Sequence, residues 1–254
     1  MSKGRAMMMG AGNLGVLSYA VFSASAALAA VPGAVQTTTE PIACSSPPCR
    51  NEPAHARLLM KDGVHEIDMN FGPAPYVDNG AIIMFPGETL VFRFPGGMDD
   101  PGIPAYANPM AMPLPQNPQP SDSDFQNDAH TGIQRDPKSG ENLYFLTKGS
   151  PFLEGGTAEE HLKGAPPNTM IVSYHQASGH PDMVLRVEHN FSRPLKYDAE
   201  MEPLSPNGPG TPVKTSTCPV MPVLSGNETW PYPLGAIRLT NFRFVDTSKG
   251  FNCD

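Results

Sequence analysis

Prolines constrain the fold of this chain more than any other residue type. Eight of them fall within one short stretch, at residues 95, 101, 104, 109, 113, 115, 118 and 120. Each proline removes a backbone donor and favours extended or turn conformations. The polar run SDSDFQNDAHTG continues this stretch to about Gly140. The sequence therefore predicts a proline-rich, irregular insertion over about residues 95–140, which is either functional or a linker.

Strand patterns dominate the rest of the chain. Short apolar runs are separated by turns rich in proline and glycine, and the only helix expected is a short one over residues 157–163. Seven to nine short strands with so little helix indicate an all-β fold. We expect an antiparallel β-sandwich of immunoglobulin-like type, formed by residues 55–254 and interrupted by the insertion.

Two hairpins are predicted in the first half of this domain. In ARLLMKDGVHEIDMNF, the Asp62-Gly63 dipeptide is a strong two-residue turn, and it places Met60 opposite His65. Both strands then present their apolar residues on one face, as a half-buried antiparallel pair requires. The segment AIIMFPGETLVFRF predicts a second hairpin with Gly87-Glu88 as its loop.

The second half predicts five more strands, at residues 142–148, 169–176, 183–191, 195–201 and 234–245. In the last of these, the apolar phase moves from Ile237 and Leu239 to Phe242 and Phe244. Such a slip indicates a β-bulge near Thr240-Asn241.

The N-terminus has the layout of a secretory signal peptide. Lys3 and Arg5 precede an uncharged, largely apolar run that ends in Ala27-Leu28-Ala29. We interpret residues 1–30 as a cleaved signal; the alternative is an uncleaved membrane anchor. Residues 31–54 would then be an N-terminal extended segment containing the loop CSSPPC. This predicts a periplasmic or secreted protein with no membrane span after cleavage.

The cysteines agree with export. All four lie after the signal, an even number that suits disulfides in an oxidising compartment. Three pairings are open from the sequence. We expect Cys44 to pair with Cys49 across the CSSPPC loop, and Cys218 to pair with Cys253, which fastens the C-terminal tail. The spacing C-x4-C could instead form a metal knuckle, but prolines stiffen this loop and it contains no histidine.

Charge excludes one class of partner. The whole chain has a formal net charge of −8, and it contains no cluster of lysine or arginine. Such an acidic chain is a poor match for nucleic acid.

The stretch SYHQASGHPDMVLRVEH, residues 173–189, is the strongest candidate for a metal site. Aligning its apolar residues as a hairpin places His175 opposite Asp182, with His180 at the adjacent end of the loop. Two imidazoles and a carboxylate suit zinc or a related transition metal. The alternative is a polar contact across an exposed strand pair. His189 lies on the apolar face of the strand, where we expect a core histidine.

The insertion contains candidate ligands for two other metals. Thioether and imidazole ligands favour copper, and four such side chains lie there: Met98, Met110, Met112 and His130. However, no histidine lies near Cys218, as a copper site built on that thiolate would need. Three acidic residues, Asp122, Asp124 and Asp128, cluster in the insertion and suit calcium, but the order and the central glycine of a calcium-binding loop are missing.

No signature of catalysis stands out. The sequence contains no Gly-x-Ser-x-Gly, His-Glu-x-x-His or Ser-x-x-Lys motif. Our leading hypothesis is an exported, non-enzymatic protein that binds an envelope or extracellular protein partner, or assembles with it, through loops on a rigid scaffold. The alternative is a periplasmic zinc-binding or copper-binding protein. Trp230 is a second candidate contact residue. Exposure of its side chain would favour recognition, and burial would favour a packing role at a strand entrance.

Overall fold

The computed structural model of the protein describes residues 36–37, 42–60, 63–69, 72–107, 134–135, 142–143, 157–177, 181–205, 208–248, 250 and 252–253. The chain divides into two units, Met1–Val31 and Pro32–Asp254, and every described residue belongs to the second. The predicted signal peptide therefore lies outside the described residues. Among the residues that are described, no helix is long and apolar enough to cross a membrane.

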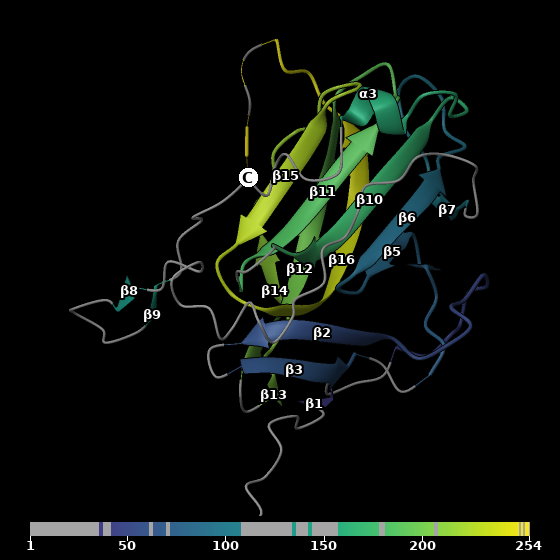
Figure 1. Ribbon diagram of the computed structural model, residues 1–254. Helices are drawn as coiled ribbons and strands as arrows, with labels where there is room; N and C mark the ends of the chain where they lie inside the picture. Colours follow the sequence, from purple (N-terminus) through teal and green to yellow (C-terminus); the bar gives the residue numbers. More distant parts are fainter. Residues whose placement is uncertain are drawn as a thin grey trace, which may run out of the picture. The chain divides into compact units, whose positions relative to one another are not determined.

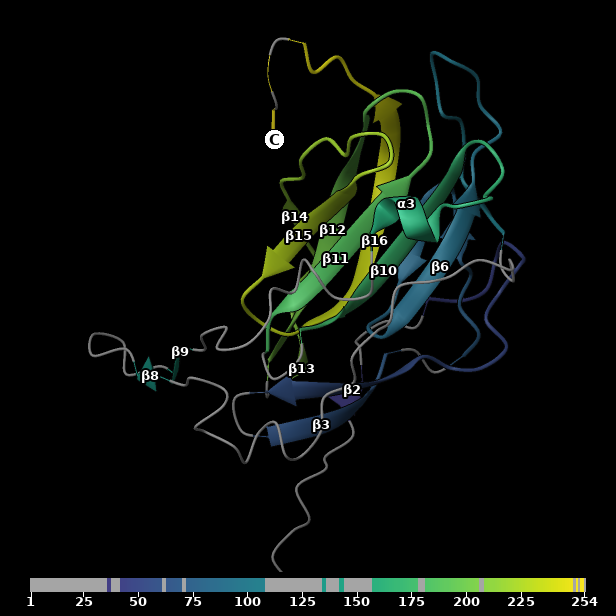
Figure 2. The ribbon, with the colours of Figure 1, turned by 45° about the horizontal axis from the view of Figure 1, so that its top comes forward.

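Two antiparallel sheets form most of the fold (Figure 1). The first has five strands, in the spatial order β15 (Ser225–Trp230), β11 (Met183–His189), β10 (Thr169–Gln176), β6 (Glu88–Arg93) and β7 (Ala105–Tyr106). The second runs in the order β13 (Gly208–Pro209), β12 (Leu195–Ser205), β16 (Leu234–Phe244), β5 (Ala81–Met84) and β4 (Val77–Asp78), and β14 (Val213–Thr215) also pairs with β12. Figure 2 shows the two sheets from a second direction.

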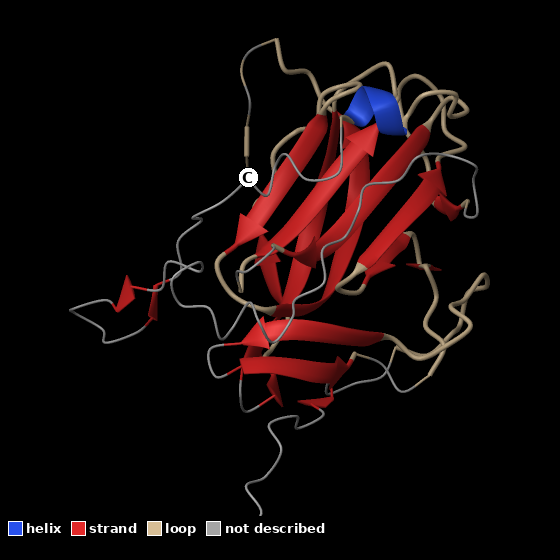
Figure 3. Cartoon of the chain, viewed as in Figure 1, coloured by secondary structure: helices blue, strands red, loops and turns tan. Residues whose placement is uncertain are grey.

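Two smaller sheets complete the described strands. β2 (His55–Met60) pairs antiparallel with β3 (Gly63–Asp68), and β3 pairs in parallel with β1 (Gln36–Thr37). β8 (Gln134–Arg135), within the predicted insertion, pairs with β9 (Asn142–Leu143); β9 lies at the start of the strand predicted over residues 142–148, and the rest of that range is outside the described residues. Figure 3 shows how far strands outnumber helix. The prediction of an all-β, largely antiparallel fold is confirmed.

One apolar core joins the two large sheets and the β2–β3 hairpin. It contains Phe92 from the five-stranded sheet, Tyr197 from the second sheet and Leu58 from β2, all nearly inaccessible to solvent. The buried hydroxyl of Tyr174 crosses this core and donates a hydrogen bond to the carbonyl of Gly235 at 3.0 Å. The sheets therefore face each other, as in a sandwich.

A buried glutamine attaches the β2–β3 hairpin to the end of β10. The Gln176 Oε1 atom accepts a hydrogen bond from the Leu59 amide at 2.6 Å, and its Nε2 atom donates to the Leu59 carbonyl at 2.9 Å. The glutamine thus satisfies both backbone groups of Leu59, which would be costly to bury unpaired.

The predicted short helix and bulge are both present. α3 (Ala158–His161) begins at Thr157 with a capping box, in which the Thr157 and Glu160 side chains bond each other's backbone amides. In the last strand, the register of β12 with β16 shifts between Lys196 and Asp198, next to Asn241 at a φ of 52°. This is the position at which the change of apolar phase predicted a bulge.

The second predicted hairpin is wrong. β5 and β6 do not pair with each other: β5 pairs with β16, and β6 pairs with β10. The Phe85 amide, at the turn between them, donates to the Glu88 carboxylate at 2.7 Å. Arg50 holds that carboxylate with bonds of 2.5 and 2.6 Å, and it also donates to the Ile83 carbonyl. The segment is therefore a corner that passes from one sheet to the other.

The other two hairpins exist, but their predicted registers are off by two residues. Met60 pairs with Gly63 instead of His65, and His65 pairs with Leu58. In the later hairpin, His175 pairs with Val184 instead of Asp182. A slip of two residues leaves every side chain on its predicted face, because side chains alternate along a strand.

The two predicted cysteine pairs are the ones that the structure brings to bonding distance. Cys44 is joined to Cys49, and Cys218 is joined to Cys253. Both pairs suit a compartment outside the reducing cytosol. The segment around Cys49 also meets the main domain, because the Arg50 amide donates to the Ala74 carbonyl at 2.9 Å.

Candidate functional site

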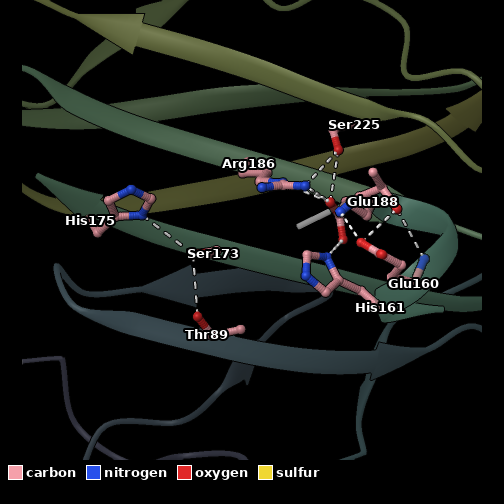
Figure 4. Close-up of polar contacts among 9 residues, drawn as sticks. Thr89, Glu160, His161, Ser173, His175, Arg186, Glu188 and Ser225 are labelled. Atoms are coloured by element: carbon pink, nitrogen blue, oxygen red, sulfur yellow. Dashed lines mark hydrogen bonds and ion pairs between the residues drawn. The ribbon is translucent and has the colours of Figure 1, made fainter. Parts of the chain in front are cut away.

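The outer face of the five-stranded sheet carries a buried polar cluster (Figure 4). Every residue of β10 and β11 is buried, on the face toward the core and on the opposite face alike. Polar side chains lie at alternating positions on that opposite face, namely Ser173, His175, Arg186 and Glu188. Burial of so many polar groups requires hydrogen bonds to compensate the lost water.

Helix α3 covers one end of this face. Its Ala158 packs, together with Leu162, against Val91 of β6 and Ile171 of β10. This packing brings His161 over the sheet, close to β11. The capping box at Thr157 fixes the helix start, and the backbone and side-chain hydrogen bonds from Thr157 lower the pKa of the Glu160 carboxyl.

The carboxylate of Glu188 is the centre of the cluster. Its Oε1 atom accepts hydrogen bonds from the Arg186 Nε atom at 2.6 Å and from the Ser225 hydroxyl at 2.7 Å. Its Oε2 atom lies 2.7 Å from the His161 Nδ1 atom. Arg186 also donates to the Ser225 hydroxyl at 3.1 Å. Strands β11 and β15 and helix α3 thus all meet at one buried carboxylate.

His175 lies beyond Arg186 on the same face. Its Nδ1 atom is 3.4 Å from the Ser173 hydroxyl, and the Thr89 hydroxyl donates to Ser173 at 3.2 Å. Burial, and then the positive charge of Arg186, lower the pKa of His175 to about 4. The imidazole is therefore neutral at neutral pH.

This geometry fits a structural network better than a reaction centre. A serine beside a neutral histidine resembles an activated nucleophile. However, Ser173 and Glu188 are both fully inaccessible to solvent. A substrate would have to reach them through the sheet or through what covers it. The cluster therefore fastens α3 and β15 to the sheet.

The predicted metal ligands are only partly described. His175 is buried and pairs with Val184, and Asp182 lies past the strand end, where its carbonyl accepts from the Ala177 amide at 2.8 Å. His180 lies outside the described residues. Within the described part of the chain, no three His, Cys, Asp or Glu side chains gather as a metal site would require. Zinc binding here stays a prediction.

The candidate ligands for copper and calcium lie, with one exception, outside the described residues. Met98 is described and exposed, whereas the remaining candidates lie outside the described residues: Met110, Met112, His130, Asp122, Asp124 and Asp128. Copper binding therefore also stays a prediction.

His189 and Trp230 pack, as their plainer interpretations expected. His189 is fully buried, and its Nε2 atom lies 2.9 Å from the Val220 carbonyl. Trp230 is also buried, and its indole donates to the Thr215 hydroxyl at 3.1 Å. Neither side chain offers a contact surface.

The start of the proline-rich insertion forms an ordered loop with exposed apolar side chains. We name residues 95–104 the proline loop. Met98 and Ile103 are 78% and 68% exposed there. The Gly96 amide donates to the Pro101 carbonyl at 2.9 Å, which closes the loop on itself. A Cβ atom at Gly96 would lie 2.2 Å from the Asp100 oxygen, so only glycine fits.

Arg193 holds the proline loop on the end of the sandwich. Its guanidinium donates to the Met98 carbonyl at 3.0 Å and lies 3.6 Å from the Asp99 carboxylate. It also lies 5.4 Å from the centre of the Phe244 ring, at the end of β16. The loop backbone is therefore fixed while its apolar side chains face solvent.

A second apolar loop lies at the same end of the five-stranded sheet. Val223 and Leu224 precede β15 and are largely exposed, and the Val223 amide donates to the carbonyl of His189. Val223 has a φ of 58°, a left-handed conformation that costs a β-branched residue on the order of 1–3 kcal/mol. Since strands β10 and β11 lie between β6 and β15, the strand ends that carry the two loops are about 14 Å apart.

Sequence reasoning missed the role of Glu188 and found the proline loop only as part of the insertion. Arg186 and Glu188 alternate with apolar residues, so the pattern indicates a solvated face.

Comparison of the chain with protein-family models, curated proteins and solved structures finds no match.

Proposed function

We propose that this is an exported, non-enzymatic protein that recognises an envelope or extracellular protein partner through the proline loop. The observation that carries the proposal is the pair Met98 and Ile103, large apolar side chains held in solvent by a fixed backbone. Ordering such residues in advance lowers the entropy lost on binding. Exposed apolar surface that gathers in one region is typical of contact sites.

Two further observations support this assignment. The loop of Val223 and Leu224 adds apolar surface at the same end, and its strained backbone is of a kind that is enriched at functional sites. The two cysteine pairs favour export to the periplasm or the exterior. We also propose that the sandwich is of immunoglobulin-like type, with the insertion extending to about residue 140, because in such folds recognition loops gather at one end.

Site-specific photo-crosslinking tests the proposal. A photoreactive amino acid replaces Met98 in one variant and Ile103 in another, and the protein is expressed in its native host before irradiation. We expect one crosslinked partner, identified by mass spectrometry, at both positions. The matched control carries the same amino acid at Glu66, which is 72% exposed on β3. A product that forms equally from Glu66, or none from the loop, refutes the proposal.

Variants of the loop measure its contribution. Met98→Ser with Ile103→Ser should weaken binding of the crosslinked partner at least tenfold, because the apolar contact is lost. Since both side chains face solvent, the same variant should unfold within about 0.5 kcal/mol of the wild type. Full binding by the double variant would place the interface elsewhere.

A further inference from the structure

A cleft lies on the outer face of the second large sheet, where β12 and β16 meet the C-terminal tail. Its volume is about 290 Å³. Lys196 of β12 and Arg243 of β16 are direct cross-strand partners and both line it. From the tail, Gly250 and Asn252 also line the cleft, and Cys253 is tied to Cys218. The Lys196 ammonium donates to the Asn252 carbonyl of the tail at 2.7 Å.

Two cations line this cleft, and among the described residues only Arg243 has an ion-pair partner. Lys196 is only 5% exposed, yet within the part of the chain that the structure describes its ammonium has one hydrogen bond and forms no ion pair. An ammonium has three donors, and a buried charge is costly unless it is paired. Arg243 is better compensated, because it donates to the Asp198 carboxylate at 2.8 Å. Like charges directly across two strands also destabilise a sheet.

An anion bound between Lys196 and Arg243 would pair the buried ammonium and would reduce the repulsion between the two cations. We propose that the cleft binds a small organic monocarboxylate, with its carboxylate on Lys196 and its hydrocarbon part against Pro219 and Val245, which also line the cleft. The size is at the lower end of ligand pockets, so the ligand is short.

The acidic residue at the cleft sets the preference for a single charge. Asp246 lines the cleft and is exposed, and the backbone and side-chain hydrogen bonds of Ser248 lower the pKa of its carboxyl. Its negative charge repels a dianion more strongly than a monoanion. A monocarboxylate is therefore favoured over phosphate. This inference does not depend on the proposed recognition by the proline loop, which lies on other residues.

Calorimetric titration of the full chain at neutral pH with butyrate, inorganic phosphate and 1-butanol tests the site. We expect saturable binding of butyrate, weaker binding of phosphate and none of butanol. Lys196→Met keeps the apolar stem and removes the charge, so it should weaken butyrate binding at least tenfold. The matched control, Lys163→Met, removes an exposed lysine after α3 and should leave binding unchanged.

A second variant keeps the test decisive if Lys196→Met does not fold. Asp246→Asn should raise the affinity for phosphate by a larger factor than the affinity for butyrate. The proposal is overturned if the wild type binds no butyrate or binds butanol equally well. Tighter binding of phosphate than of butyrate by the wild type would overturn the choice of a monocarboxylate.

Discussion

The two large sheets each bury charge on their outer face, and they do so in opposite ways. On the five-stranded sheet, the Glu188 carboxylate meets Arg186, His161 and Ser225 within 2.7 Å. On the other sheet, the Lys196 ammonium meets one backbone carbonyl. Burial of a charge therefore does not by itself indicate a ligand site. What separates the two regions is whether the protein supplies the compensating groups.

The largest expected effect comes from breaking the compensated cluster. Glu188→Gln keeps the shape of the side chain but leaves the Arg186 guanidinium buried without its counter-charge. Breaking a buried pair in this way costs about 3–5 kcal/mol, and we expect a loss of this size in the free energy of unfolding. Urea denaturation at neutral pH measures it.

The control for that variant is an exposed pair. The Glu66 Oε1 atom lies 3.7 Å from the Arg57 Nη1 atom, and Glu66 is largely exposed. Glu66→Gln should therefore lower the free energy of unfolding by about 0.5 kcal/mol or less. Similar losses in the two variants would show that the Glu188 cluster contributes no more than a surface pair.

Acid should weaken the fold through its buried neutral histidines. Burial lowers the pKa of both His175 and His189 to about 4, from 6.5 in the unfolded chain. Between pH 6.5 and pH 4 the unfolded state therefore binds more protons, and stability falls as the pH falls through this window. The shift of each histidine corresponds to a loss of stability on the order of 3–3.5 kcal/mol, at about 1.4 kcal/mol per pKa unit.

A single substitution separates the contribution of His175. His175→Gln cannot be protonated, so its stability should change less steeply between pH 6.5 and pH 4 than that of the wild type. Thermal unfolding across this range measures the difference. Parallel curves for the two proteins would mean that His175 titrates alike in the folded and unfolded states.

The smallest effect is expected at the uncompensated cation. Lys196→Met removes a buried charge that forms no ion pair with the residues the structure describes, and it retains an apolar stem of similar length. Without added ligand, the variant should be as stable as the wild type or more stable by up to about 1 kcal/mol. Denaturation in a buffer free of carboxylates and phosphate measures this, and a loss above 2 kcal/mol would make Lys196 a structural residue like Glu188.

The sequence predicted which residues share a face better than it predicted which strands pair. The bounds of β10 and the bulge beside Asn241 followed from apolar periodicity and its change of phase. The two register errors were both of two residues, which the pattern cannot detect because the faces stay the same. The β5–β6 corner depends on Arg50, far along the chain, so local patterns could not reveal it.

The candidate sites were harder to predict for a related reason. Ser173 and His175 alternate with apolar residues, which normally indicates a solvated face. At the other end of this face, Glu188 is covered by α3 through His161, a contact that no local pattern of β11 encodes. Lys196 likewise looks like an ordinary outward-facing strand residue. Lys196 is buried with a single hydrogen bond because of its partner strand β16 and the disulfide-linked tail, and both lie far from it in the sequence.

The corner at Phe85–Glu88 has a consequence for how the chain acquires its structure. Because β5 and β6 part there, each strand has one neighbour that is far away in sequence: Ile82 pairs with Leu239, and Val91 pairs with Ile171. Pairing between such distant segments slows folding, since long loops must close first. A chain that emerges N-terminus first cannot complete the second large sheet until β16, near its C-terminal end, has appeared.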